Sequence, residues 1–273
     1  TPVYHDDTQA IQNAIDHAIN LIRTSGTFAE HCSIVFPSGE YLTTGTIFTK
    51  PYIKLISNGF VVLKYNGTGT AIRAKLDADE PFFYKEMWNR GSFITGKQGA
   101  FVIQNTNDKP TGSIGLDLGD ENRNEVDFSR FTVEHIGITG FETGILIRNV
   151  NTYLGVFDNI HLEGNKWNVR TYSDGVNPTR NSGENFRFIN SIFAISEIVI
   201  KHETDAFDLV FTNCSFDFNH HVIEFNKGYS SVRFDTCYFE AVHQNIINSL
   251  TPPDPIRGNT VFFNNCIIYS KIR

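Results

Sequence analysis

The apolar and polar positions of this chain repeat in blocks, and the repeat is clearest between residues 207 and 240. Placing FDLVFTNCSFDF over SSVRFDTCYFEA sets like residues against each other in four pairs: Phe211 with Phe234, Cys214 with Cys237, Phe216 with Phe239, and Asp217 with Glu240. This stretch therefore contains one structural unit written twice.

The same unit recurs from Phe131 to the end of the chain, at spacings of 23 to 31 residues. The position of Cys214 is held in successive units by Ile136, Ile160, Ser191, Cys214, Cys237 and Cys266. An apolar column follows two residues later: Ile138, Leu162, Phe193, Phe216, Phe239 and Ile268. Another precedes it by three residues: Val133, Phe157, Phe188, Phe211, Phe234 and Phe263. A polar column lies one residue before it: His135, Asn159, Asn190, Asn213, Thr236 and Asn265.

A self-similar period of this length is typical of a solenoid. Each unit contains three short strands, so we expect an all-β parallel β-helix with three strands in each turn, or rung. The polar column marks the bend between the first two strands, where stacked amides can hydrogen-bond between rungs. A β-sandwich also has a strand every 8 to 12 residues or so. It would not require the same residue type at the same place in successive units.

The N-terminal half shows the same organisation less regularly. Apolar residues recur at three- and four-residue steps between Asp6 and Arg23, which predicts an amphipathic helix capped by Asp6 or Asp7 and covering one end of the stack. Residues 32–72 alternate short strands with turns, and residues 77–125 are interpreted as rungs with insertions. We expect one domain: the cap helix and lead-in (1–30), N-terminal rungs (31–130) and regular rungs (131–273).

Composition agrees with β structure and excludes some partners. Among the 273 residues, 24 are Phe and only 19% are charged, and aromatic side chains suit a pleated, half-buried surface. The net charge of −7 argues against a nucleic-acid partner, which would require a basic surface. No apolar run is long enough for a membrane span, so no membrane insertion is expected.

The four cysteines are Cys32, Cys214, Cys237 and Cys266. Three of them share one repeat position, so they should stack in the interior. A ladder of buried free thiols is favoured over disulfides or a metal site, because free cysteine is among the most buried residue types. No CxxC or Cys/His zinc spacing is present, and neither a metal nor another cofactor is expected.

Candidate chemistry lies on the outward face of the second strand. Because side chains alternate between faces, the outward column reads Thr139, Glu163, Ala194, Asp217, Glu240 and Tyr269. Asp217 and Glu240 would lie on adjacent rungs about 4.7–4.9 Å apart. Two carboxyl groups that close do not ionise independently. A pair with one protonated and one ionised member is what glycoside hydrolysis requires. The alternative is a chance stacking of two surface acids.

A second outward column is expected on the third strand, formed by Arg148, Arg170 and Lys201, with Glu224 on the following rung. These cations would favour an acidic sugar, or they pair with local acids such as Glu203. His220 and His221 follow Asp217 closely and are candidate substrate contacts. Tyr172 is a candidate stacking platform, whereas Trp167 is expected to face the core.

Two motifs carry a resemblance to a known family. The opening DDTQAIQNAID helix, followed by a strand and PSGEY, resembles the pectate-lyase-like superfamily of right-handed parallel β-helices. Within it the chain is similar to bacteriophage tailspike depolymerases. Several of these share a Gly-Glu pair, an S-x-D-aromatic-N stretch and a carboxylate after a Cys-x-x step. The matching segments here are Gly183-Glu184, Ser215–Asn219 and Cys237–Glu240.

The resemblance implies that Glu184, Asp217 and Glu240 form a catalytic acidic trio. It also implies a homotrimer in the virion tail that cleaves a bacterial capsule or lipopolysaccharide endo-hydrolytically. Further candidate substrate-binding residues are Glu163 in the acid column and Arg187, which is close in sequence to Glu184. The insertions at 171–184 and 249–259 are expected to flank a groove.

Two alternatives remain open: a lyase on the same fold, and a noncatalytic glycan-binding or structural β-helix. The chain also stops on an apparently complete strand, which would leave an open edge. We therefore expect it to be a fragment of a longer chain.

Overall fold

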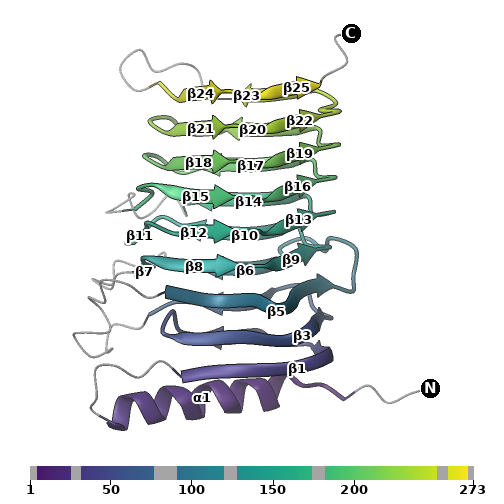
Figure 1. Ribbon diagram of the computed structural model, residues 1–273, viewed down its shortest axis with the longest axis vertical. Helices are drawn as coiled ribbons and strands as arrows, with labels where there is room; N and C mark the ends of the chain where they lie inside the picture. The colour runs from purple at the N-terminus through teal and green to yellow at the C-terminus, as the bar shows by residue number, and fades with distance from the viewer. Residues whose placement is uncertain are drawn as a thin grey trace.

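A computed structural model describes residues 5–25, 32–76, 91–119, 128–173, 182–250 and 258–269. The described strands stack as parallel rungs between the two ends of the molecule (Figure 1). The first strands of the regular rungs are β8 (Phe131–Glu134), β12 (Val156–Asp158), β15 (Phe186–Ile189), β18 (Asp208–Thr212), β21 (Ser231–Asp235) and β24 (Thr260–Asn264). The second strands are β9 (Ile136–Thr139), β13 (His161–Glu163), β16 (Ile192–Ala194), β19 (Ser215–Asp217), β22 (Tyr238–Glu240) and β25 (Ile267–Tyr269).

The third strands form a separate sheet: β2 (Ile47–Thr49), β4 (Thr70–Ala74), β6 (Ile114–Leu118), β10 (Thr143–Arg148), β14 (Trp167–Tyr172), β17 (Ile198–Glu203), β20 (His221–Phe225) and β23 (Asn245–Ser249). In the N-terminal rungs the first and second strands are fused into three long strands: β1 (Cys32–Thr43), β3 (Ile53–Tyr65) and β5 (Gly91–Asn105). Strand β5 pairs with both β8 and β9, so first and second strands share one sheet. Two short strands, β7 (Phe128–Ser129) and β11 (Thr152–Tyr153), pair separately.

The inward columns predicted from the repeat are confirmed by the register. Phe188 pairs with Phe211 and Phe211 with Phe234, and these rings stack with centroids 4.7 and 5.3 Å apart. On the second strand the rings of Phe216 and Phe239 stack at 4.8 Å. Each of these side chains is fully buried. Stacked aromatic pairs contribute about 0.5–1.5 kcal/mol beyond their burial, so the columns strengthen the packing between successive rungs.

The bend between first and second strands coincides with the predicted polar column. All six residues of that column have φ between 51° and 56°, in the left-handed region: His135, Asn159, Asn190, Asn213, Thr236 and Asn265. Asparagine tolerates this conformation better than most residues. Amide bonds also link rungs here, because Asn213 Nδ2 donates to Asn190 Oδ1 over 2.8 Å.

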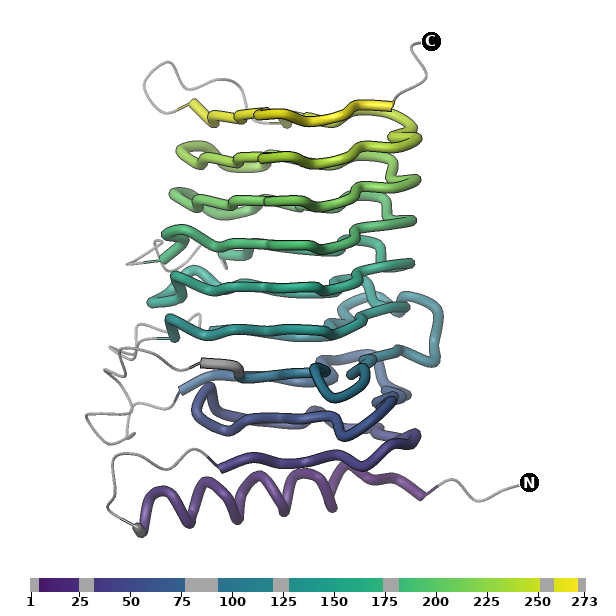
Figure 2. Tube along the Cα trace, viewed as in Figure 1, coloured from purple at the N-terminus to yellow at the C-terminus, as the bar shows by residue number. Residues whose placement is uncertain are grey.

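The cap helix is confirmed as α1 (Thr8–Ser25), which begins and ends two residues later than expected and lies across the N-terminal end of the stack (Figure 2). Asp6 and Asp7 anchor its start. Asp6 Oδ1 accepts the Thr8 amide at 3.0 Å, while Asp7 Oδ2 accepts the Leu42 amide of β1 at 3.0 Å. Hydrogen bonds from Thr44 and Thr8 lower the pKa of Asp6 to about 2. The described part of the chain contains no helix long and apolar enough to cross a membrane.

The cysteines are free thiols, as predicted. Cys214 and Cys237 are buried, and each Sγ donates to a carbonyl of the preceding rung, at Phe188 and Phe211 respectively, over 3.4 Å. The pKa of Cys214 is raised by its contact with the Cys237 thiol and by burial. Cys266, on the final described rung, is only half-buried.

One buried titratable side chain makes the core sensitive to acid. His202 on β17 is fully buried, where its ring nitrogens share hydrogen bonds with Thr171 Oγ1 at 2.7 Å and Ser230 Oγ at 2.5 Å. Burial lowers its pKa to about 3, from an ordinary 6.5. As pH falls, the unfolded chain therefore takes up this proton first. The stabilising contribution is complete above the ordinary pKa and is lost as pH falls toward the folded one.

We predict that His202→Gln flattens the acid dependence of stability, since Gln keeps polar contacts but cannot be protonated. Urea unfolding at about pH 7 and about pH 4 should show a smaller fall in the free energy of unfolding for His202→Gln than for the wild type. His17→Gln, at an exposed position of α1, is the control and should keep the wild-type dependence. Equal losses for His202→Gln and the wild type would contradict the assignment.

Candidate active site

Asp217 and Glu240 occupy the same outward position on neighbouring rungs. Asp217 ends β19 and Glu240 ends β22, and the two residues pair directly in the parallel register. Both are half-buried, whereas Phe216 and Phe239 beside them point into the core. Alternation along the strand turns both carboxyl groups outward, about 4.7–4.9 Å apart at the backbone.

Each acid has a hydroxyl partner two residues earlier on its own strand. Ser215 Oγ lies 2.8 and 2.9 Å from the two carboxylate oxygens of Asp217, to which it donates. Tyr238 occupies the equivalent position next to Glu240. Desolvation raises the pKa of Tyr238, and the charge of Glu240 and a hydrogen bond to it raise it further. These hydroxyls orient the carboxyl groups but carry no opposite charge.

The acid pair differs from some other acids on the molecule in having no charged partner of opposite sign among the described residues. Among the residues that the structure describes, Asp217 and Glu240 form no ion pair. By contrast, Glu134 pairs with Lys97 at 2.6 Å, and Glu142 pairs with Lys166 at 3.4 Å. The acid pair is therefore available to a ligand.

Glu184 does not join the pair. It is exposed and lies just before β15, whereas Asp217 lies at the far end of the second strand. The first and second strands of a rung separate the two positions, because the start of β15 and the end of β19 lie on opposite sides of the stack (Figure 1). The structure thus brings together two members of the predicted trio and leaves Glu184 apart.

The predicted cation column on the third strand needs a correction. Arg170 pairs in register with Lys201, and Lys201 pairs with Glu224 on the next rung, but the partner of Arg170 on β10 is Leu146. Arg148 instead pairs with Tyr172. A shift of two residues keeps a side chain on the same face of a strand, which is why the sequence alignment did not reveal it.

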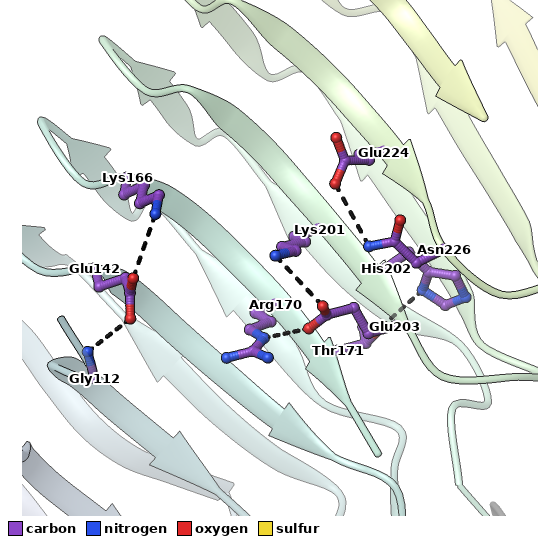
Figure 3. A network of polar contacts seen from close by, with 10 residues as sticks. All are labelled: Gly112, Glu142, Lys166, Arg170, Thr171, Lys201, His202, Glu203, Glu224 and Asn226. Atoms are coloured by element: carbon purple, nitrogen blue, oxygen red, sulfur yellow. Dashed lines mark hydrogen bonds and ion pairs between the residues drawn. The ribbon is translucent and has the colours of Figure 1, made fainter. Parts of the chain in front are cut away.

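Arg170 and Lys201 both contact the carboxylate of Glu203. Arg170 Nε bonds Glu203 Oε2, and Lys201 Nζ lies 3.4 Å from Oε1 (Figure 3). The structural alternative foreseen for these cations is therefore present. They also lie on the eight-stranded sheet, whereas Asp217 and Glu240 lie on the other sheet.

Arg148 is built into the fold. Its Nε and Nη2 donate to the two carboxylate oxygens of Asp117 at 2.7 and 2.8 Å, and Arg73 Nη1 lies 3.4 Å from the same carboxylate. Asp117 is fully buried and Arg148 is 7% exposed.

Trp167 does not face the core as expected. It is half-buried, with the Lys201 ammonium 3.6 Å from the ring centroid and the Lys166 ammonium at 4.7 Å. Arg170 lies over both Trp167 and Tyr172, at 5.0 and 4.7 Å. Sequence analysis missed this cation–aromatic cluster, because Trp167 was expected to face the core.

The remaining predicted binding residues are spread over several surfaces. Glu163 continues the acid column but is separated from Asp217 by Ala194, and it contacts His161 at 3.0 Å. Arg187 is exposed on the first strand β15.

The two predicted histidine contacts separate at the bend after Asp217. His220 is exposed there, and His221 begins β20 in the other sheet. Most of the two insertions predicted to flank a groove, residues 174–181 and 251–257, lies outside the described residues.

The fold and the register define a parallel β-helix with an outward acid pair. Residues 4–233 match the family model "Rhamnogalacturonase A/epimerase, pectate lyase-like". The chain belongs to this pectate-lyase-like family, which confirms the expected superfamily and its right-handed parallel β-helix.

Solved structures show the same fold at low sequence identity. The tailspike protein of Acinetobacter phage vB_ApiP_P1 is 11% identical, with a TM-score of 0.59 over 97% of this chain and 51% of that one. The iota-carrageenase of family GH82 from A. fortis is 17% identical, with a TM-score of 0.53 over 86% and 52%. PfbA, a surface adhesin of Streptococcus pneumoniae, is 13% identical, with a TM-score of 0.50 over 98% and 76%. The chain spans about half the length of the tailspike and the carrageenase.

We predict that Arg148 and Arg170 differ sharply in their contribution to stability. Arg148→Met leaves the buried Asp117 carboxylate without its bidentate partner and should lower the free energy of unfolding by about 3–5 kcal/mol. Arg170→Met removes a partly exposed pair, and Glu203 keeps Lys201, so the loss should be about 1 kcal/mol or less. Urea denaturation of both variants measures the difference. Similar losses would show that Arg148 is not the structural member of the two.

Proposed function

We propose that this protein is a tailspike-type depolymerase that hydrolyses glycosidic bonds of a bacterial surface polysaccharide, with Asp217 and Glu240 as the reacting carboxyl groups. The observation that carries the proposal is the in-register acid pair with a hydroxyl partner for each member and no described cation. The family description, a tailspike and a carrageenase of the same fold support a polysaccharide as the substrate.

The pair supplies the chemistry as follows. One carboxylic acid donates its proton to the glycosidic oxygen as the bond to the anomeric carbon breaks. The other, as a carboxylate, either attacks that carbon directly or removes a proton from an attacking water. Carboxyl groups about 5–5.5 Å apart give retention of configuration, and a separation of about 6.5–9.5 Å gives inversion. Adjacent rungs allow either outcome, so the anomeric configuration of the first product distinguishes them.

The proposed mechanism does not use Glu184, because this residue precedes β15 at the start of a rung, whereas Asp217 ends the second strand β19. The resemblance to tailspike depolymerases supports the further proposal of a homotrimer in a virion tail that binds capsule or lipopolysaccharide. Arg170, Lys201 and Tyr172 lie on the adjoining sheet, and in this setting they would contact a more distant part of the glycan chain.

A second candidate function is glycan binding without turnover. It is favoured by the surface adhesin, which shares the fold over 98% of this chain. Under this alternative the acid pair would hydrogen-bond sugar hydroxyls and no bond would break.

We predict that incubation with purified capsular polysaccharides and lipopolysaccharides produces new reducing ends without the ultraviolet absorbance of unsaturated uronate. Reducing ends together with that absorbance would indicate a lyase. Neither signal, with retained binding, would support the noncatalytic alternative.

Asp217→Asn and Glu240→Gln should each lower kcat by about 10²–10⁴-fold, the usual contribution of a general acid or base. Asp208→Asn is the matched control. Asp208 begins β18 in the same rung as Asp217 and bonds the hydroxyl of Ser231 at 2.5 Å, but it lies at the other end of the strands. It should retain wild-type kcat. Full activity in both acid variants would rule out the assigned pair.

A further inference from the structure

A cavity of about 470 Å³ opens at the bend between the second and third strands. In the sequence, this bend directly follows the position of the acid pair. Two apolar side chains, Ile195 and Phe218, contribute to its wall. Polar side chains line it as well, among them Lys166, Glu197, His220 and His243. Phe218 directly follows Asp217, and its amide donates to the Glu240 carbonyl at 2.9 Å. The cavity therefore begins one residue beyond the proposed reacting groups.

The apolar residues of the cavity occupy a strained backbone position. Ile195 and Phe218 have φ of 51° and 56°. The same bend in earlier rungs is made by Gly140 and Gly164, at 82° and 66°. Left-handed backbone costs residues with a side chain roughly 1–2 kcal/mol, and a β-branched residue such as Ile is a clear outlier there.

These side chains also gain little from burial. Ile195 is 52% exposed and Phe218 is 50% exposed. Glycine would relieve the backbone strain, and a polar residue would avoid exposing apolar surface. Folding alone therefore does not account for Ile and Phe at these two positions, and strained residues of this kind cluster at ligand sites.

The bend itself is held rigidly by a buried amide. Asn219 is fully buried; its Oδ1 accepts from the Ser196 amide and hydroxyl at 3.1 and 2.8 Å, and its Nδ2 donates to the Phe193 carbonyl at 2.9 Å. The backbone that carries Ile195 and Phe218 is thus pre-organised before any ligand arrives.

The polar side of the cavity is a column of titratable groups that follows the rungs. Glu142, Lys166, Glu197, His220 and His243 occupy the same place after successive bends. Lys166 contacts Glu142 at 3.4 Å, and the rings of His220 and His243 meet edge to face at 5.6 Å. Hydrogen-bond donors and acceptors therefore stand beside a half-exposed aromatic ring.

From these observations we infer that the cavity is a sugar-binding subsite that takes one pyranose ring. The ring of Phe218 contacts the apolar face of the sugar, and the polar column binds its hydroxyl groups. The inference rests on the proposed function, because it places a neighbouring sugar unit of the polysaccharide at the bend that follows Asp217 and Glu240. It requires binding only, so it can be tested separately from cleavage.

The test uses Phe218→Gly, with Ala241→Gly as the matched control. Ala241 makes the same bend on the next rung, at φ 49°, and does not line the cavity. Glycine removes the strain at both positions, so neither variant should melt earlier than the wild type. Only Phe218→Gly removes the aromatic surface.

Binding is measured by saturation-transfer NMR with the methyl glycosides of glucose, galactose, N-acetylglucosamine and glucuronic acid. At least one glycoside should bind the wild type and Ala241→Gly, and it should bind Phe218→Gly about tenfold more weakly, equivalent to about 1.4 kcal/mol. Wild-type binding that persists in Phe218→Gly, or no binding of any of the four glycosides to the wild type, would overturn the subsite.

Repeating the measurement in an Asp217→Asn, Glu240→Gln double variant separates the two proposals. If the acid variants keep full activity while glycoside binding still depends on Phe218, the catalytic assignment fails and the subsite stands. If the acids are essential but binding is independent of Phe218, the subsite fails alone. A change of oligomeric state in Phe218→Gly, with unchanged glycoside binding, would show that the exposed ring serves subunit contact instead.

Discussion

In-register parallel pairing between rungs is the constraint on which the whole molecule depends. Every residue of a regular rung lies about 4.7–4.9 Å from its equivalents above and below, so each sequence position becomes a column along the solenoid axis. Inward columns bury Phe188, Phe211 and Phe234 as a stack of rings. A side chain of the wrong size in such a column disturbs the packing of both neighbouring rungs. Residue types therefore repeat more strictly at inward positions than at outward ones.

The same constraint brings outward side chains of neighbouring rungs close together. Asp217 and Glu240, for example, lie side by side through strand pairing alone, without a special loop. Some outward charges are matched with opposite ones, for example Lys201 with Glu203. The proposed subsite lies at a bend where Phe218 takes the left-handed conformation that glycine takes in earlier rungs.

The sequence predicted the columns because the first two strands and the bend between them keep a constant length. The positions of Cys214, Phe216 and Asn213 were thus predicted correctly, and so was the in-register placement of Asp217 and Glu240 on neighbouring rungs. The third strand was predicted less well, because the bend before it leaves the start of the strand ambiguous by two residues. A two-residue error in register keeps Arg148 on the outward face, so the residue pattern does not reveal it. Glu184 was included in the site by a sequence motif alone. Motif spacing carries no information on whether a residue lies at the start or at the end of the strands of a rung. The Phe218 cavity depends on backbone conformation, which no residue pattern in the repeat reveals.

The most direct test is a crystal structure of the Glu240→Gln protein with an oligosaccharide from a polysaccharide that the wild type degrades. We predict a sugar unit lying across positions 217 and 240, with the next unit beyond the bend, against Phe218. An oligosaccharide bound across Arg170 and Lys201 on the eight-stranded sheet, with Asp217 in solvent, would contradict it.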